Sequence, residues 1–520
     1  MTTSGAGPGS AVTAIDTQVF ERRWKILVVL CTSLMVVIVG NTALNVALPT
    51  LARELGASTS AQQWMVDGYG LVFAGLLLTA GTLGDRYGRK GALQIGLLVF
   101  LVGSLSAAFM NSASGVIAGR AVMGFGAAFV MPATLSILTN VFPAQERGKA
   151  IAIWAGISGG GAAIGPVASG FLLTHFSWGS VFLVNVPIIL VALAAGKVLL
   201  PTSRDPEPGA LDPVGAVLSI ASLGTLVYAI IEAPHRGWAS GASLTWFAVA
   251  ILLIAAFLMW EFRSSAPMLD LRYFLDPRFG VAAGVITLVF FAMFGFFFLL
   301  TQYFQLVLGY GTFEAGVKQL PFAAVMMVLA PNSPRVAAKY GAKRVVAFGL
   351  VCVATAMFLF TISRVDTSYW ALLPVMMTMA GGMAMVIPSM TGSIMSAVPL
   401  GKAGVGSAMN DTTRELGGAL GVAVLGSLVA SRYGTELRPA IALLPDDLKA
   451  KANESLAGAL QAAGALQGTM ATDVNRIARE AYVAGIHVAA IVAGSVVLIA
   501  SAFVYRKLPA GNPHATAAGH

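Results

Sequence analysis

Ionisable side chains inside apolar stretches are the residues of this sequence that could do chemistry. Asp411 and Glu415 are spaced i and i+4 in one apolar run, so a helix there places both carboxylates on one face beside Arg414. Asp67 and Glu232 lie near the ends of two other apolar runs. Charge inside a bilayer is costly and usually functional. These four carboxylates are therefore candidates for carrying protons across a membrane.

Structural explanations compete with this one. Asp67 and Glu232 could be solvated acids at the membrane interface, and Asp411 and Glu415 could pair with Arg414 to hold the helix in register. Arg120 lies in a further apolar run. It either faces the protein interior and takes part in proton or substrate coupling, or lies near the interface with its charged end extended to water.

Composition indicates that lipid surrounds most of the chain. Of the 520 residues, 57% are hydrophobic and 11% charged, with mean hydropathy +0.81, whereas a soluble chain has about a quarter of its residues charged. The net charge of +9 comes from Lys and Arg clusters between apolar runs. That distribution is typical of membrane topology and excludes a nucleic-acid-binding face.

The ionisable residues are positioned by apolar runs that are long enough to cross a bilayer. A span needs about 20 apolar residues as helix, because hydrocarbon offers no partner to the backbone. The sequence predicts an all-α polytopic membrane protein with fourteen spans. They are residues 26–48, 64–83, 92–110, 115–138, 150–173, 180–200, 213–232, 243–262, 281–307, 318–336, 345–362, 370–391, 404–430 and 483–505.

Basic residues predict the orientation of these spans. Alternate loops hold nearly all Lys and Arg, and the short loops of the opposite set hold only Arg53, Arg236, Lys318 and Arg364. Because basic residues gather in cytoplasmic loops, both termini are expected in the cytoplasm. Segment 431–481 is then external, and residues 446–466 in it are expected to form a weakly amphipathic helix.

Linkers divide the spans into groups of six, two and six. Charged, proline-containing segments at 201–213 and 263–278 bracket spans 7 and 8. The loops after spans 2 and 10 also resemble each other, which indicates two related halves. The expected parts are a cytoplasmic tail 1–24, a six-helix bundle 25–200, a linker with spans 7 and 8 at 201–265, a second bundle 266–507 that includes segment 431–481, and a cytoplasmic tail 508–520.

Enzymatic and metal chemistry find little support in the sequence. Cys31 and Cys352 lie far apart, and the five histidines are scattered, so neither type has metal-binding spacing. No nucleophile, base and orienting group occur at a recognisable spacing, and no phosphate-binding GxxxxGK[ST] loop is present. We expect no catalytic residues, metal or cofactor.

The loop after span 2 carries a specific motif. Residues 81–90, GTLGDRYGRK, resemble at every fixed position the loop signature of the major facilitator superfamily. Gly88 permits a tight turn, Asp85 can accept hydrogen bonds from the N-terminus of a neighbouring helix, and Arg86 and Arg89 can meet lipid phosphates. The motif is either a conformational latch, which would include Gly81, or a structural basic turn.

Three further stretches extend the resemblance. Arg120 with residues 123–128 is similar to the family's second signature, and residues 161–170, GAAIGPVASG, look like its antiporter signature with Gly161, Gly165, Pro166 and Gly170. Residues 42–49, 177–187 and 410–421 are similar to the fourteen-span drug:proton antiporter branch. The resemblance implies the major facilitator fold, with two six-helix bundles plus two extra helices.

This resemblance also implies a function. It points to a multi-pass protein of the cell membrane, expected to be the bacterial inner membrane. Such a protein exports lipophilic drugs in exchange for protons, and we expect it to be a monomer. Gly40 departs from the branch, which usually has an aspartate there. The proton carrier would then lie among Asp67, Glu232, Asp411 and Glu415, assisted by Arg120 and Arg414. The alternatives are a dedicated exporter of one endogenous lipid or metabolite without proton coupling, and a receptor or scaffold that keeps the fold.

A substrate cavity between the halves would be lined by amide, aromatic and sulfur-containing side chains. Such surfaces suit varied lipophilic ligands, although most of these residues are expected to serve packing. The candidate cavity residues are Asn41, Asn45, Trp64, Phe294, Phe298, Met383 and Asn410.

Overall fold

The structure is a computed structural model of the whole chain. It describes residues 17–55, 59–205, 212–264, 267, 269–442, 444–466 and 468–508. The described part is helical, in this order: α1 (Thr17–Leu55), α2 (Thr59–Tyr87), α3 (Arg89–Phe109), α4 (Ala113–Val141), α5 (Ala144–His175), α6 (Ser180–Leu183), α7 (Asn185–Leu199), α8 (Pro213–Arg236), α9 (Gly241–Arg263), η1 (Leu271–Leu275), α10 (Pro277–Gln302), η2 (Tyr303–Val307), α11 (Thr312–Val317), α12 (Leu320–Leu329), η3 (Ala330–Asn332), α13 (Ser333–Tyr340), α14 (Ala342–Leu359), η4 (Phe360–Ile362), α15 (Tyr369–Ser396), η5 (Leu400–Lys402), α16 (Ala403–Leu437), α17 (Asp446–Glu454), α18 (Leu456–Gly464) and α19 (Gly468–Lys507).

The fourteen predicted spans are present as helices. Thirteen helical segments of the described part are long and apolar enough to cross a membrane, and the two segments of α5, Ala144–Gly161 and Ile164–His175, together form a fourteenth span bent by 40°. Span 10 is more broken than its apolar pattern predicts. Pro331 and Pro334 stand in the first turns of η3 and α13, where a missing N–H is tolerated but a continuous helix is interrupted.

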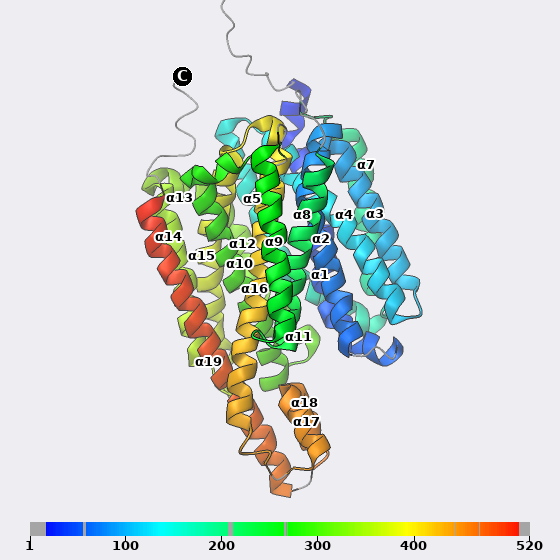
Figure 1. Cartoon of the computed structure of the whole chain (residues 1–520), viewed down its shortest axis with the longest axis vertical. Coiled ribbons are helices and arrows are strands. Elements are labelled where there is room, and N and C mark those ends of the chain that lie inside the picture. Colours follow the sequence, from blue (N-terminus) through cyan, green and yellow to red (C-terminus); the bar gives the residue numbers. More distant parts are fainter. Residues whose placement is uncertain are drawn as a thin grey trace, which may run out of the picture.

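The helices pack in two groups with a pair between them (Figure 1). In the first group α1 contacts α5 and α7, and α4 contacts α2 and α3; in the second α10 contacts α16, and α14 contacts α15 and α19. The groups meet where α16 contacts α2 and α4, and where α5 contacts α12 and α15. The pair α8 and α9 packs together, with α8 against α2 and α16. The pair thus contacts one helix of each group.

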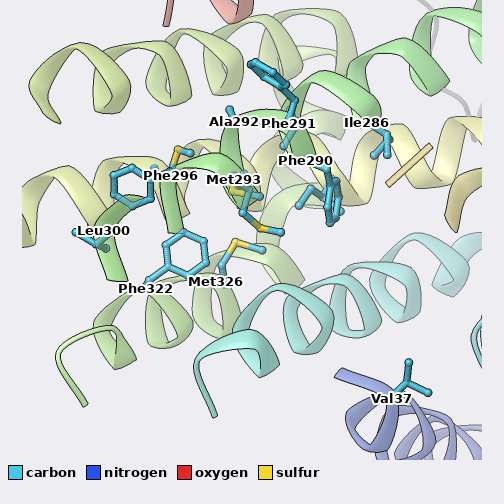
Figure 2. Packing of buried hydrophobic residues seen from close by; sticks show 14 of the residues in the cluster. Val37, Ile286, Phe290, Phe291, Ala292, Met293, Phe296, Leu300, Phe322 and Met326 are labelled. Carbon is cyan, nitrogen blue, oxygen red and sulfur yellow. The ribbon is translucent and has the colours of Figure 1, made fainter. Parts of the chain in front are cut away.

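Aromatic and sulfur side chains fill the second group (Figure 2). Phe290, Phe291 and Phe296 of α10 are buried, with Phe322 and Met326 of α12 beside them. The rings of Phe297 and Phe322 meet edge to face at 4.7 Å between centroids. Most of the aromatic residues in predicted span 9, residues 281–307, therefore serve packing.

Helices α16 and α19, with 35 and 40 residues, are longer than a bilayer core needs. α19 has 40 residues, about 60 Å of helix, which is twice the thickness of a bilayer core. α17 and α18 pack against each other beside the first part of α19, far from the end of that helix at Lys507 (Figure 1). The prediction of a single helix over 446–466 is wrong, because the segment forms two helices. Ser455 separates them and caps α18 by accepting the N–H of Gly458.

Glycines let α3 and α4 approach closely. A Cβ on Gly126 would lie 2.6 Å from the carbonyl oxygen of Gly96 and from the amide nitrogen of Phe100, both rigid backbone atoms. The same atom on Gly91 would meet nothing within 4 Å.

We therefore expect Gly126→Ala to destabilise the protein by about 1–3 kcal/mol through overpacking. Gly91→Ala, the same chemical change on α3, should leave stability unchanged or slightly raised. Thermal unfolding of both variants in detergent measures the difference, and equal melting temperatures would contradict the close α3–α4 contact.

Candidate functional site

Asp411 lies in a buried polar cluster on α16. Its side chain is fully covered, and its Oδ1 accepts from Asn410 Nδ2 at 3.3 Å and pairs with Arg414 Nη1 at 3.4 Å. Thr391 Oγ1 on α15 donates to Asn410 Oδ1 at 3.0 Å. The other oxygen of Asp411, Oδ2, is buried without a hydrogen-bond partner in the described part of the chain.

Arg414 joins the two halves. Its Nη2 donates to Ser158 Oγ on α5, and its guanidinium lies 5.4 Å from the ring centroid of Trp154 on α5 and 4.6 Å from that of Phe290 on α10. The ion pair expected within span 13 is thus present between Asp411 and Arg414, and it also reaches across the interface. Glu415 is half-buried, and among the described residues no cation lies within ion-pair distance of it.

Arg120 faces the protein interior. It is fully buried and donates to the carbonyl oxygens of Met65 and Gly40, both at 2.9 Å, and to Asn41 Oδ1 at 3.2 Å. The ring of Tyr69 lies 4.3 Å from the guanidinium carbon. The interfacial position considered for Arg120 is therefore wrong, and Asn41 is one of its partners.

Asp67 and Glu232 come together between α2 and α8. Both line one small cavity, together with Trp64, Leu71, Tyr228 and Ile231. Glu232 pairs with Arg236 Nε at 3.0 Å, and Arg236 Nη2 donates to the hydroxyl of Tyr228 at 2.7 Å. The sequence did not predict that the two acids lie together, nor that Tyr228 and Arg236 are the partners of this cluster. The spacing of residues 228, 232 and 236 on one helix face was the available signal.

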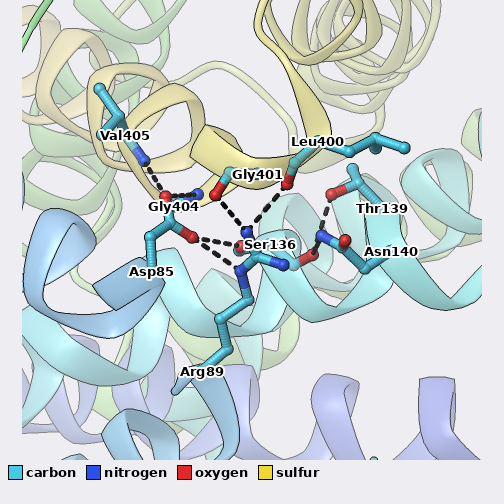
Figure 3. A network of polar contacts seen from close by, with 9 residues as sticks. All are labelled: Asp85, Arg89, Ser136, Thr139, Asn140, Leu400, Gly401, Gly404 and Val405. Carbon is cyan, nitrogen blue, oxygen red and sulfur yellow. Dashed lines mark hydrogen bonds and ion pairs between the residues drawn. The ribbon is translucent and has the colours of Figure 1, made fainter. Parts of the chain in front are cut away.

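Polar contacts, termed the Asp85 latch, join the loop after α2 to the start of α16 (Figure 3). Asp85 Oδ2 accepts the amides of Gly404 at 2.7 Å and Val405 at 3.2 Å, and Oδ1 pairs with Arg89 Nε at 2.7 Å. The carboxylate thus meets the positive end of α16, as its position in the sequence predicts.

Arg89 completes this latch. Its Nη2 donates to the carbonyl oxygens of Leu400 at 2.9 Å and Gly401 at 2.7 Å (Figure 3). The side chain is buried, so the expectation that Arg89 meets lipid phosphates is wrong. Gly88 has φ of 119°, which glycine adopts readily. Arg86 is half-buried and lies over the ring of Tyr87.

Close backbone contact also forms the latch. A Cβ on Gly81 would lie 2.6 Å from the carbonyl oxygen of Gly404, and one on Gly404 would lie 2.5 Å from that of Gly81. Sequence analysis identified Gly81 and Asp85 but missed residues 400–405, since no local pattern states which helix start a carboxylate will meet.

The bent helix α5 contacts both halves through its glycines. A Cβ on Gly161 would meet Met35 of α1, and one on Gly165 would meet Thr42 of α1. Nearer the end of α5, Gly170 lies against Phe313 of α11. Gly316 of α11 in turn lies against Pro166. The two halves therefore touch at the latch and also between α5 and α11.

The candidate cavity residues have different surroundings. Met383 and Asn410 are fully buried, Phe294 is half-buried against Gly418, and Phe298 is 37% exposed. The side chain of Asn45 lies outside the described residues. No group of three or more His, Cys, Asp or Glu that could hold a metal ion occurs within the described ranges.

The latch predicts a difference between two arginines of one loop. Arg89→Gln removes one partner of a buried ion pair, which costs about 3–5 kcal/mol and should loosen the contact between α2 and α16. Arg86→Gln changes the same residue type three positions away and leaves the Arg89–Asp85 pair in place. In purified protein whose Cys31 and Cys352 are replaced by serine, maleimide labelling of Ser136→Cys, which is buried beside Asp85, should rise about tenfold or more with Arg89→Gln. Equal labelling in both arginine variants would contradict the latch.

The sequence of this chain is similar to those of known proteins. The family model described as Major Facilitator Superfamily matches residues 30–422. The chain is 37% identical to the multidrug efflux pump LfrA of Mycolicibacterium smegmatis, over 95% of this chain and 97% of that protein. It is 33% identical to the tetracenomycin C resistance and export protein of Streptomyces glaucescens, over 92% and 91%, and 33% identical to the methyl viologen resistance protein SmvA of Salmonella typhimurium, over 92% and 97%.

A solved structure supports the fold alone. The human organic anion transporter MFSD10 is similar with a TM-score of 0.61 at 14% identity, over 93% of this chain and 99% of that one. The apolar helices, the Asp85 loop that closes on a second half, and these matches lead to one conclusion: the chain is a multi-pass membrane protein that belongs to the major facilitator superfamily of transporters.

Proposed function

We propose that this chain is a secondary active exporter that carries amphipathic, drug-like compounds out of the cell in exchange for protons. The observation that supports this most is the likeness, over more than nine tenths of the chain, to proteins named for multidrug efflux, antibiotic export and methyl viologen resistance. The bent glycine–proline helix α5, whose motif resembles the antiporter signature, supports export over uptake.

Asp411 is the proton site that the geometry favours. Its Oδ2 has no hydrogen-bond partner in the described structure, while its Oδ1 pairs with Arg414, which also holds Ser158 of the other half. A proton on Asp411 removes the charge that attracts Arg414. Protonation of Asp411 would therefore act on a contact between the halves. Antiport requires such a link between proton binding and the arrangement of the halves.

The contacts at both ends fit an occluded state of an alternating-access cycle. In our proposal the Asp85 latch closes the cytoplasmic end, and the α5–α11 contact closes the external end. Both chain termini then lie in the cytoplasm, and the protein acts as a monomer. Asp67 and Glu232 would lie near the external end, where protons enter.

Accessibility labelling tests this orientation. Single cysteines at Arg86 and Arg344 should react with impermeant maleimide in inside-out vesicles, and a cysteine at Arg364 should react in right-side-out cells, because basic loops stay in the cytoplasm. Arg86 and Arg344 on opposite faces would overturn the topology.

Proton coupling is tested by transport into liposomes with an imposed pH gradient. We expect Asp411→Asn to reduce gradient-driven transport about 5- to 150-fold, the usual range of a coupling free energy, and Glu415→Gln to reduce it less. Glu436→Gln is the matched control, because Glu436 lies on the same helix, paired with Arg432 and exposed. Unchanged transport in both Asp411 and Glu415 variants would remove α16 from the coupling mechanism.

Gly40 favours a second candidate, a dedicated exporter of one endogenous lipid or metabolite without proton coupling. The residue stands where the related branch usually has an acid, and the guanidinium of Arg120 meets its carbonyl oxygen. Expression in an efflux-deficient host separates the two functions. Resistance to several unrelated dyes supports the first, and release of a single native compound without substrate-dependent proton flux supports the second.

A further inference from the structure

A cavity of about 590 Å³ lies between α18 and α19, outside the transport machinery described above. Its volume is in the range of sites that hold small molecules. Its wall is part apolar and part basic. The lining residues that matter are Leu460 and Ala463 of α18, Arg476 and Arg479 of α19, and Val365 from the loop before α15.

The depth of this cavity follows from the length of α19. The basic residues Arg506 and Lys507 end the helix. Counting back about 20 residues, the length that crosses the hydrocarbon core, places the other membrane boundary near residue 485. Arg479 is six residues further, about 9 Å along the helix, so its long side chain reaches the level of the lipid headgroups.

The two arginines differ in charge balance. Arg476 pairs with Asp473 at 3.5 Å and with Glu480 at 3.1 Å, so its charge is neutralised. Arg479 donates through Nη1 to the carbonyl oxygen of Val307 at 3.1 Å, and its Nε is buried without a hydrogen-bond partner. Within the described ranges no carboxylate lies at ion-pair distance from Arg479. The cavity wall therefore carries one positive charge that no carboxylate of the described residues compensates.

We propose that this cavity binds the headgroup of an anionic phospholipid, with the phosphate on Arg479 and the glycerol and first acyl carbons against Leu460, Ala463 and Val365. A guanidinium suits a phosphate because its N–H groups match the phosphate oxygens in pairs. Two features favour a lipid over a free anion as the ligand. Arg479 lies at the level of the lipid headgroups, and a free phosphate would leave the apolar part of the wall without a contact.

The position of the site suggests what bound lipid does. Val307, which Arg479 holds, ends η2 and is followed after four residues by α11, the helix that packs against α5 at one end of the molecule. A phosphate on Arg479 would fix the guanidinium between α19 and this segment. The lipid would thus connect the extension formed by α17, α18 and the start of α19 to the contact between the halves.

Lipid retention by the purified full-length protein tests the site without measuring transport. The protein is exchanged into mixed micelles of detergent with either phosphatidylglycerol or phosphatidylcholine, and bound lipid is counted by native mass spectrometry. We expect Arg479→Gln to weaken phosphatidylglycerol binding about fivefold, the effect of one basic residue at a membrane surface. Arg476→Gln, the matched control in the same wall, should change it little, and phosphatidylcholine should bind weakly to all forms.

Two further measurements keep the test decisive. Leu460→Trp fills the cavity without altering charge and should also reduce phosphatidylglycerol retention, with thermal unfolding confirming that each variant is folded. Competition by soluble glycerol phosphate at a concentration equal to that of the lipid would show that the site takes a free anion, which overturns the proposal. Equal retention by the parent and Arg479→Gln would overturn it as well. Neither result bears on proton-coupled export, because no transport is measured.

Discussion

A buried charge in hydrocarbon must find its partner inside the protein, and two of the buried ion pairs described here involve α16 or its first residues. The start of α16 receives the carboxylate of Asp85 from α2, its middle carries the Asp411–Arg414 pair, and Arg414 reaches Ser158 on α5. Further along, Ser427 accepts the indole N–H of Trp238, which follows α8. One helix of the second half is thereby tied to the first half and to the extra pair of helices.

These ties differ in kind, and the difference bears on motion. The latch combines a buried ion pair, helix-end amides and the close approach of Gly81 to Gly404, so separating the two segments would break several interactions at once. The contact at the other end, where Gly170 meets Phe313 and Gly316 meets Pro166, is made by apolar atoms and backbone. A polar closure depends on charge and can respond to protonation, whereas an apolar closure depends on shape.

Sequence reasoning succeeded where the physical rule is local. Every backbone group must be paired in lipid, so each span is an apolar run and fourteen spans could be counted. For Arg120 the cost of a buried charge left an interior and an interfacial position open, and the structure shows the interior one. It could not state which helices meet. That Asp67 and Glu232 share a cavity, that Arg89 turns to Leu400, and that Arg120 binds the carbonyl of Gly40 all depend on helix packing, which no periodicity in a single run encodes.

Gly40 occupies the position at which the related antiporter branch usually has an aspartate. A Cβ at this position would come within 2.7 Å of the buried ring of Phe100, so a carboxylate there would not fit the present packing. Arg120 instead uses two carbonyl oxygens, the amide of Asn41 and the face of Tyr69, all of them neutral. Neutral partners hold a guanidinium in place but cannot exchange a proton near neutral pH. In the mechanism we propose, the charge that changes therefore lies elsewhere, on the buried carboxylate of Asp411, which is joined through Arg414 to Ser158 of the opposite half.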